Sequence, residues 1–476
     1  MKIRLIVLLT ALSLTSSAQS DSVMMRTISN EILMHGVCYD NLRVLCKTIG
    51  NRISGSPQAA KAVEWGLKAM QATGADKVWL QPVDVPLWIR GQEKLAFKFP
   101  GDKNFTEVNV LSIGNTSGSA NKLLEAEVVM VSDAEAFKQL PDEAVKGKII
   151  FFNYRFRQDF VMPFEAYSDA VKYRGMAPNI ASPRGALATI IRSVSSGADD
   201  YPHTGAMRYA DSVKPIPAVA VGNNTADILE QKCKSGKVMA QLQSNCHMAG
   251  IVRSYNVIGE ITGTDYPNQY ILVGGHLDSW DVGEGAHDDG AGTVQSIEVM
   301  RAIKATGIKP RHSVRSVLFM NEENGLKGGL AYADSAKANN EKYVIAIETD
   351  AGGFSPRGLE LNMETSKQSQ IQSYRNLFLP YGVYDFEEEG GGADISPLQR
   401  MGVPVAGLRP DPQRYFDVHH TRNDVFENVN HRELKLGAVV LTQLIYLVDK
   451  YNLGHVYDLH ETTTDSNNPY SQRKKK

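Results

Sequence analysis

Histidines and carboxylic acids are concentrated in five short segments of the second half of the chain. The segments are 274–278, 285–292, 320–325, 348–353 and 419–424. In chain order they supply His276, Asp288, Glu323, Asp350 and His420. Imidazole and carboxylate groups without a thiolate suit zinc, although cobalt and manganese accept the same donors. The sequence therefore predicts a metal centre that these five residues share.

The first segment places His276 and Asp278 at the end of an apolar run. Alternate residues of a strand project to the same side, so the two side chains are expected to lie together. A metal-bound histidine commonly donates its other ring N–H to a carboxylate, and Asp278 is placed to accept it. The alternative interpretation is a His–x–Asp pair on the protein surface that binds no metal.

The second segment contains two adjacent acids, Asp288 and Asp289, between glycines at the start of a predicted helix. Asp289 can cap that helix, which frees Asp288 to point elsewhere. Because a carboxylate has two oxygens, Asp288 could bridge two cations. Simple helix capping is the alternative interpretation.

The third segment contains Glu322 and Glu323 directly after an apolar run. Two adjacent buried carboxylates repel each other and lose water, so they are costly unless they have partners. A metal would bind one glutamate and leave Glu322 to act as a general base. A solvated loop is the alternative.

The elements that must position these residues alternate between strands and helices. Short apolar runs predict buried strands at 270–274, 317–320, 343–347 and 405–408. Helices are predicted over 293–306 and after Asn430, where Glu433 completes a capping-box pattern. This alternation predicts a three-layer α/β domain, and such sheets bind ligands at the carboxyl ends of their strands.

The first part of the chain predicts further elements of this domain. Residues 26–50 have a helical pattern, and Ser56 and Pro57 predict the start of a second helix that ends near Gly74. The run 78–85 predicts a strand, and Pro82 indicates that it lies at a sheet edge.

Residues 124–248 differ from the rest of the chain in their sequence pattern, because short apolar runs are separated by polar or turn-rich stretches. We expect a compact β-rich unit inserted into the larger domain, which would comprise 19–123 and 249–460. Its middle, 154–183, is rich in Arg, Tyr, Pro and Met. That stretch is either an ordered loop over a cleft or a solvated surface.

The composition is that of a globular protein, with 42% hydrophobic and 22% charged residues among 476. The formal net charge of −2 gives no reason to expect nucleic acid or an anionic membrane as a partner. The four cysteines, Cys38, Cys46, Cys233 and Cys246, are too few for a disulfide scaffold. Free buried thiols are favoured over a bridge.

The two ends of the chain have compositions of their own. Lys2 and Arg4 precede an apolar stretch and the small residues 16–18, which is typical of a secretory signal. Residues 1–18 therefore predict export to the periplasm or beyond the cell. Residues 461–476 end in a basic run and predict a flexible tail.

Taken together, these motifs resemble those of the co-catalytic di-zinc aminopeptidases. Within that family they are similar to the carboxypeptidase Q-like peptidases that carry a protease-associated domain. The most specific part is HLDSWDVGEGAHDDGAG at 276–292, and residues 52–57, 88–91 and 256–260 are also similar. The resemblance covers nearly the whole chain after residue 18.

The resemblance implies a zinc-peptidase domain with a mixed central sheet, interrupted by a protease-associated domain at 124–248. It implies two zinc ions. His276 and Asp350 would hold one, Glu323 and His420 the other, and Asp288 would bridge them. Glu322 would be the general base, and Asp278 would support His276.

The implied activity is hydrolysis of dipeptides or short peptides that have a free amino terminus. Three alternatives remain on the same fold: a C-terminal exopeptidase, a glutaminyl cyclase and a non-catalytic binding protein like the transferrin receptor. Lesser expectations concern Asp394, for a substrate amino group or a structural cap, Tyr415, for an oxyanion, and Arg409 and Arg414, for a substrate carboxylate. The side-chain preference stays open, as does a homodimer.

Overall fold

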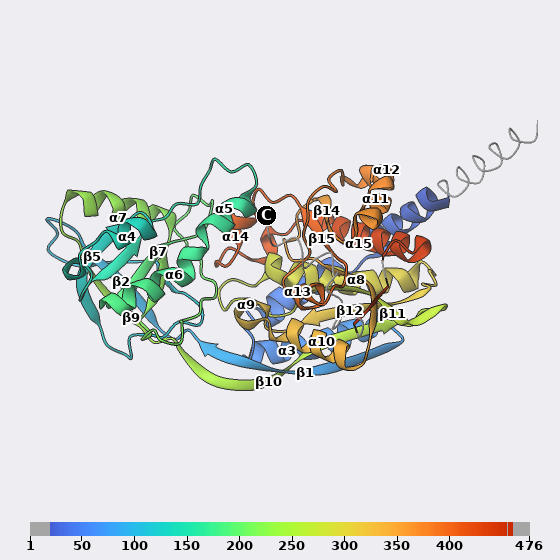
Figure 1. The fold of residues 1–476 in the computed structure, drawn as a ribbon, viewed down its shortest axis with the longest axis horizontal. Coiled ribbons are helices and arrows are strands. Elements are labelled where there is room, and N and C mark those ends of the chain that lie inside the picture. The colour runs from blue at the N-terminus through green and yellow to red at the C-terminus, as the bar shows by residue number, and fades with distance from the viewer. Residues whose placement is uncertain (1–19, 455, 460–476) are drawn as a thin grey trace, which may run out of the picture.

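The computed structural model describes residues 20–454 and 456–459, which contain two eight-stranded sheets (Figure 1). The predicted secretory signal and basic tail lie outside the described residues. None of the described helices combines the length and the apolar character needed to cross a bilayer.

The first sheet is mixed and has the strand order β1-β10-β12-β11-β13-β15-β14, with β16 beside β13. The strands are β1 (Lys77–Ile89), β10 (His247–Ile261), β11 (Tyr266–His276), β12 (His312–Phe319), β13 (Lys342–Glu348), β14 (Pro356–Asn362), β15 (Val405–Pro410) and β16 (Tyr457–Asp458). β12, β11, β13 and β15 run parallel, while β1, β10, β14 and β16 pair in antiparallel fashion. The four predicted strands are the parallel centre of this sheet.

Helices cover both faces of the first sheet, which gives the expected three layers. The main helices are α3 (Pro57–Ala72), α8 (Ala291–Ala305), α10 (Lys327–Ala338), α13 (Ser396–Arg400) and α15 (His431–Tyr451). On β11, Ile271 and Val273 pack in one core with residues of α3, α8 and α15. The intervening Leu272 packs in another core with Tyr332 of α10. Because successive side chains of β11 point to opposite faces, they pack into apolar cores on both sides of the sheet.

Smaller helices complete this part of the chain. Residues 20–35 are helical, followed by α2 (Cys38–Val44), which confirms the helical pattern predicted for the N-terminal region. The remaining helices are α9 (Glu322–Gly325), α11 (Thr365–Ser373), α12 (Arg375–Phe378) and α14 (Tyr415–Val418).

The predicted helix starts are confirmed with one difference in detail. The Ser56 side chain accepts a hydrogen bond from the Ala59 N–H and caps α3. Asn430 caps α15 by accepting from the amides of residues 432 and 433. Glu433 does not return the bond as a capping box would, because its carboxylate accepts from the Ser355 hydroxyl instead.

Strand β1 lies at the edge of the first sheet, as Pro82 indicated. It pairs with β10 from Lys77 to Ile89. Figure 1 shows these two long strands of the first sheet extending toward the second sheet. The pair connects the two halves of the molecule.

The second sheet has the order β3-β2-β9-β5-β6-β7-β8-β4. Its strands are β2 (Glu93–Lys98), β3 (Thr106–Val108), β4 (Leu111–Ser112), β5 (Leu124–Val131), β6 (Ile149–Phe152), β7 (Ala188–Arg192), β8 (Ala218–Val221) and β9 (Met239–Ser244). β5 to β8 are parallel. Three strands precede residue 124, so this sheet begins before the predicted boundary. We call residues 93–244 the second unit.

Helices also cover both faces of the second sheet. α7 (Asn223–Ser235) packs on one face, and α4 (Ala134–Lys138) and α6 (Lys172–Ala181) pack on the other. The stretch 154–183, which was expected to be either an ordered loop or a solvated surface, instead contains two helices, α6 and α5 (Pro163–Ala170).

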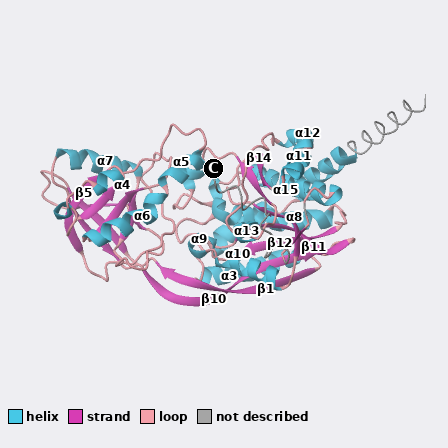
Figure 2. Cartoon of the chain, viewed as in Figure 1, coloured by secondary structure: helices cyan, strands magenta, loops and turns pink. Residues whose placement is uncertain are grey.

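Helix α5 touches the first part of the molecule rather than solvent alone. Its Phe164 ring lies 4.9 Å from that of Phe416 on α14. Figure 1 shows α5 beside α14, and Figure 2 shows α5 between the two sheets. The second unit thus reaches the loop that carries the last predicted metal ligand.

The cysteines are free, as expected. Cys38, Cys46 and Cys246 are buried, and Cys233 is half-buried.

Candidate metal centre

The five predicted ligands converge on one point. The Nε2 atom of His276 lies 3.1 Å from Asp288 Oδ1 and 3.5 Å from Asp350 Oδ1. The Nε2 atom of His420 lies 3.1 Å from Asp288 Oδ2 and 3.1 Å from Glu323 Oε2. Asp288 therefore stands between two groups of donors, one oxygen toward each.

The first sheet brings these residues together at the carboxyl ends of its parallel strands. His276 is the last residue of β11, and Asp350 follows β13 by two residues. Glu323 lies in the short helix α9 just after β12. Asp288 precedes α8, and His420 follows α14. This is the edge at which open α/β sheets bind ligands.

The donors fit a metal. Asp288 Oδ2 and Asp350 Oδ1 are buried and have no hydrogen-bond partner among the described residues. Buried carboxylate oxygens without partners are costly unless a cation compensates them. The ligand atoms of His276, Asp288 and Asp350 lie within 4.8 Å of one another, as do those of Asp288, His419 and His420. The N/O donor set suits zinc.

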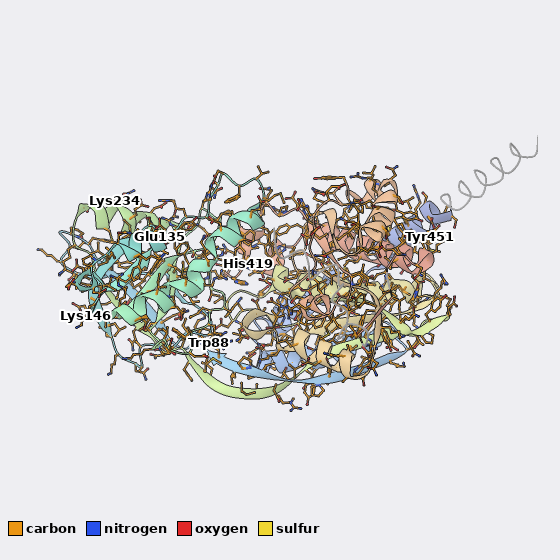
Figure 3. All side chains as sticks on the ribbon, in the orientation of Figure 1. Trp88, Glu135, Lys146, Lys234, His419 and Tyr451 are labelled. Carbon is orange, nitrogen blue, oxygen red and sulfur yellow. The ribbon has the colours of Figure 1, made fainter. Side chains whose placement is uncertain are left out.

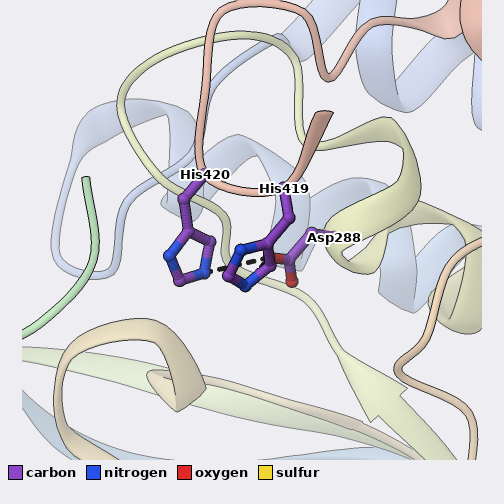
Figure 4. Close-up of side chains that lie close together, drawn as sticks. All are labelled: Asp288, His419 and His420. Carbon is purple, nitrogen blue, oxygen red and sulfur yellow. Dashed lines mark ion pairs between the residues drawn. The ribbon is translucent and has the colours of Figure 1, made fainter. Parts of the chain in front are cut away.

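His419 and His420 compete for the last ligand position (Figure 4). Their rings are stacked with centroids 3.5 Å apart. His419 Nε2 lies 3.6 Å from Asp288 Oδ2, farther than His420, and His420 also approaches Glu323. The geometry favours His420.

The second unit holds the His419–His420 loop through the backbone. The Thr204 N–H donates to the His420 carbonyl at 2.9 Å, and His420 Nδ1 donates to the Thr204 carbonyl at 3.3 Å. His203 Nδ1 donates to the His419 carbonyl at 2.6 Å. His419 thus lies where the two halves of the molecule meet (Figure 3).

Asp278 does not make the contact expected for it. His276 Nδ1 donates to the backbone carbonyl of Asp278 at 3.0 Å, while the carboxylate is 3.9 Å away. That carboxylate accepts from the Asn321 and Glu322 amides at 2.6 and 3.1 Å. Asp278 therefore fixes both the tautomer of His276 and the turn that presents Glu322.

Asp289 acts as the helix-start acid that the sequence suggested. Its carboxylate accepts from the Gly292 amide at 2.8 Å and from the His276 amide at 2.9 Å. It therefore ties the start of α8 to the end of β11, and leaves Asp288 to face the donors.

Two supporting residues were not predicted from the sequence. The Asp424 carboxylate accepts from the amides of His287 and Asp288. The buried Arg52 side chain donates to the carbonyls of Leu277, Glu284 and Gly285. Because these contacts join segments far apart in the chain, no local pattern signals them; only the resemblance at 52–57 pointed to Arg52.

His276 and Asp288 shift each other's pKa values in opposite directions. Burial by itself would lower the pKa of His276, but Asp350 and Asp288 outweigh it and hold that pKa well above its ordinary value. Burial opposes ionisation of Asp288, yet the hydrogen bond from His276 and the nearby His420 imidazole hold its pKa well below the usual range. Asp288 is therefore ionised between two imidazoles.

Glu322 has no side-chain hydrogen bond to any described residue, and it is half-buried. Burial raises the pKa of Glu322 to about 8, with Asp350 and Asp288 adding to the rise and His276 opposing it. A carboxyl group that is near the donors and free of partners is available to a ligand. A cation bound by the neighbouring carboxylates would lower its pKa toward the working range.

A cavity of about 300 Å³ opens beside Asp350. The first sheet lines it with Glu348, Glu360 and Arg409, and the second unit adds Phe164 of α5. Arg409 is not simply exposed, because its guanidinium pairs with Asp385 at 3.0 Å. The cavity is large enough for a side chain of a bound peptide.

Asp394 directly follows Ala393, which lines this cavity. It is buried, and neither carboxylate oxygen has a partner within the described part of the chain. Its amide donates to Glu348 Oε1 at 3.3 Å, and its side chain caps no helix. Burial and the charge of Glu348 raise the pKa of Asp394 well above its usual value. The structural-cap interpretation is therefore wrong.

Comparison with known proteins gives one family. Residues 256–444 match the family described as Peptidase family M28. Carboxypeptidase Q of Homo sapiens is 34% identical over 411 residues, which are 86% of this chain and 84% of that protein.

Two solved structures are also similar to this chain. A peptidase M28 precursor from Shewanella amazonensis is 31% identical, with a TM-score of 0.85, over 91% of this chain and 97% of its own. A zinc aminopeptidase from Bacillus subtilis is 19% identical, with a TM-score of 0.60, over 86% of this chain and 94% of its own. The second likeness is one of fold.

Proposed function

Because the chain belongs to peptidase family M28, and is thus a metallopeptidase, we propose that it is a di-zinc exopeptidase acting on dipeptides or short peptides with a free amino terminus. The observation that carries the proposal is the convergence of His276, Glu323, Asp350 and His420 around Asp288. Glu322 beside them adds a proton-transfer group.

The residues would divide into two metal subsites. His276 and Asp350 would hold one zinc, Glu323 and His420 the other, and Asp288 would bridge them through its two oxygens. When bound, zinc acts as a Lewis acid that polarises a carbonyl and makes water a nucleophile at neutral pH.

Glu322 would do the proton transfer. Its carboxylate accepts the proton of the attacking water and passes it to the nitrogen of the leaving amine as the peptide bond breaks. Asp278 fixes the Glu322 amide and so aims the side chain. Hydrolysis by this route needs no covalent intermediate.

The second unit would be the protease-associated domain, and it would form one wall of the substrate cleft. Met162 and Phe164 line the cavity beside Asp350 together with residues of the first sheet. This placement supports a role in enclosing short substrates. Export of the enzyme, to the periplasm or beyond, is a further proposal that rests on the composition of residues 1–18.

The direction of attack is tested with the zinc-loaded protein, a tripeptide and a pair of dipeptides. We expect the tripeptide to lose its N-terminal residue, and the free dipeptide to be cleaved at least roughly 10²-fold faster than its N-acetylated form. Mass spectrometry of the products measures both. Equal cleavage of the two dipeptides would contradict the requirement for a free amine.

A C-terminal exopeptidase is the second candidate. It is favoured by the name carboxypeptidase Q, which relatives about one-third identical carry. Loss of the C-terminal residue from the tripeptide would establish it. A non-catalytic binding protein is disfavoured because the donors and Glu322 are all present.

The choice between the two adjacent histidines gives a separate prediction. We expect His420→Ala to lose roughly one zinc per chain and most of its activity, because His420 alone approaches both Asp288 and Glu323. His419→Ala is the matched control, and should keep both ions with at most about a 10–100-fold loss of affinity. Metal content after dialysis against a weak chelator measures this. Loss of metal from His419→Ala alone would reverse the assignment.

A further inference from the structure

The second unit contains a buried positive charge that has no counter-ion. Arg174 on α6 is 4% exposed, and its guanidinium makes no ion pair with any described carboxylate. Nε and Nη2 have no hydrogen-bond partner in the described part of the chain. Burying an unpaired cation costs stability, so its retention indicates a use other than folding.

Among the described residues, the guanidinium of Arg174 makes one hydrogen bond, and its partner lies toward the metal centre. Its Nη1 donates to the Tyr167 hydroxyl oxygen at 3.0 Å. Its guanidinium lies against Gly205, where an added Cβ would stand 2.2 Å from Nη1. Gly205 follows Thr204, whose carbonyl accepts from His420. Arg174 is thus packed directly behind the ligand loop.

Tyr167, on α5 of the second unit, contacts both Arg174 and His419. Its ring is stacked on Phe416 at 4.7 Å and meets the His419 ring edge-on at 5.2 Å. His419 is in turn stacked on His420. Asp288 and Glu322 are among the charged groups that act on the phenol. The Tyr167 ring is therefore held between Phe416 and the stacked pair of His419 and His420.

The Tyr167 hydroxyl accepts a hydrogen bond but donates none to the described residues. Its oxygen accepts from Arg174, but its own O–H has no acceptor among residues 20–454 and 456–459. A phenol that accepts from a guanidinium is polarised and becomes a stronger donor. Tyr167 is half-buried, so part of its side chain stays open to solvent.

We propose that Tyr167 is a further catalytic residue, which donates a hydrogen bond to the oxygen of the scissile carbonyl as negative charge develops there. Arg174 is its positioning residue. The inference rests on the proposed peptidase function and makes the second unit part of the catalytic site. Donors fixed in advance at such an oxygen are among the larger contributions to hydrolysis.

The test compares three single variants, and the double variant of Tyr167→Phe with Arg174→Met, with the wild-type holoenzyme. Tyr167→Phe removes only the hydroxyl, and we expect kcat to fall roughly 10²-fold while KM changes little. Tyr154→Phe is the matched control, because Tyr154 is another half-buried tyrosine of the second unit whose hydroxyl bonds Asp169. It should retain wild-type activity.

Arg174→Met tests the positioning role. If Arg174 acts through Tyr167, the double variant is no slower than Tyr167→Phe alone. An arginine kept for folding would lower the melting temperature when replaced, whereas removal of an unpaired buried charge should leave it unchanged or raise it. Fully multiplicative losses in the double variant would contradict the positioning role.

Binding gives a readout that does not depend on turnover. Tyr167→Phe should weaken a phosphinic dipeptide, which mimics the tetrahedral intermediate, roughly 10²-fold in calorimetry and leave product affinity unchanged. If wild type hydrolyses peptides and Tyr167→Phe matches it in rate and in phosphinate affinity, the role of Tyr167 is wrong. If wild type hydrolyses no peptide, the proposed function fails and this inference falls with it.

Discussion

Glu322→Gln is expected to reduce kcat by roughly 10²–10⁴-fold while the protein keeps its metal. The amide has nearly the same shape as the carboxylate but cannot accept the proton of the attacking water. The Glu322 side chain contacts neither histidine of the cluster, so its replacement leaves the donor set in place. Initial rates with a dipeptide and metal content by mass spectrometry measure the two effects separately.

Two comparison variants make this result specific. Glu323→Gln changes the adjacent residue in the same way but removes a donor 3.1 Å from His420, so we expect it to lose metal. Glu143→Gln makes the same change on the exposed surface of the second unit and should have no effect. A Glu322→Gln enzyme with more than half the wild-type kcat would place the general base elsewhere.

The sequence could predict that these side chains would lie together, because three of the five follow or end a strand. A buried apolar run followed by a polar residue marks the carboxyl end of a strand, and parallel strands bring those ends to one edge. His276, Glu323 and Asp350 follow β11, β12 and β13 in this way. The order of the strands could not be read locally, but it was not needed to gather the ligands.

The contacts that support the donors were harder to predict, because they depend on distant segments. Nothing near Asp424 indicates that its carboxylate accepts from the Asp288 amide. The spacing of His276 and Asp278 suggested a carboxylate–imidazole contact, whereas the chain bends after β11 and offers the Asp278 carbonyl instead. Periodicity reports which face of an element is buried, and it carries no information about such loops.

The second unit shows the same limit of local patterns. The composition of 154–183 suggested an ordered loop or a solvated surface, yet the stretch contains α5 and α6. Tertiary packing explains this, since Phe164 and Tyr167 pack their rings on Phe416 of α14 rather than within their own sheet. The composition that looked like a solvated surface is that of a contact between the two halves.

Removal of the metal is expected to make the stability of the protein fall as pH rises. In the metal-free chain, burial raises the pKa of Glu322 to about 8 and of Glu348 to about 7, and raises that of Glu323 well above its usual value. These carboxyl groups hold protons in the folded state that they release on unfolding. Their stabilising effect is complete below about pH 4.5 and is lost as pH rises through 7 to 8.

Four buried histidines oppose this sign in part. Burial lowers the pKa values of His203, His287, His419 and His420, so their contribution to stability increases as pH rises toward about 6.5. The buried carboxyl groups with raised pKa values, which also include Asp289, Asp394 and Asp424, outnumber them.

The pKa of His276 is also raised, so its contribution is likewise lost as pH rises. The pKa of Asp288 is lowered, and its contribution changes only below about pH 4, outside the window. We therefore expect the metal-free protein to melt about 5 °C or more lower at pH 8.5 than at pH 5.5 in scanning calorimetry.

Zinc should abolish or reverse that dependence, because the ionised carboxylates become ligands and metal binding releases protons. At a free zinc concentration of about 1,000 times Kd, binding adds about 4 kcal/mol to the free energy of unfolding. Metal-free Glu322→Gln supplies the internal control: it lacks one raised carboxyl, so it should melt above metal-free wild type at pH 8.5 and close to it at pH 5.5. The substitution that stops hydrolysis would then stabilise the empty site, because the carboxylate that catalysis requires is one that the metal-free fold disfavours. A metal-free wild type that melts higher at pH 8.5 than at pH 5.5 would contradict this account.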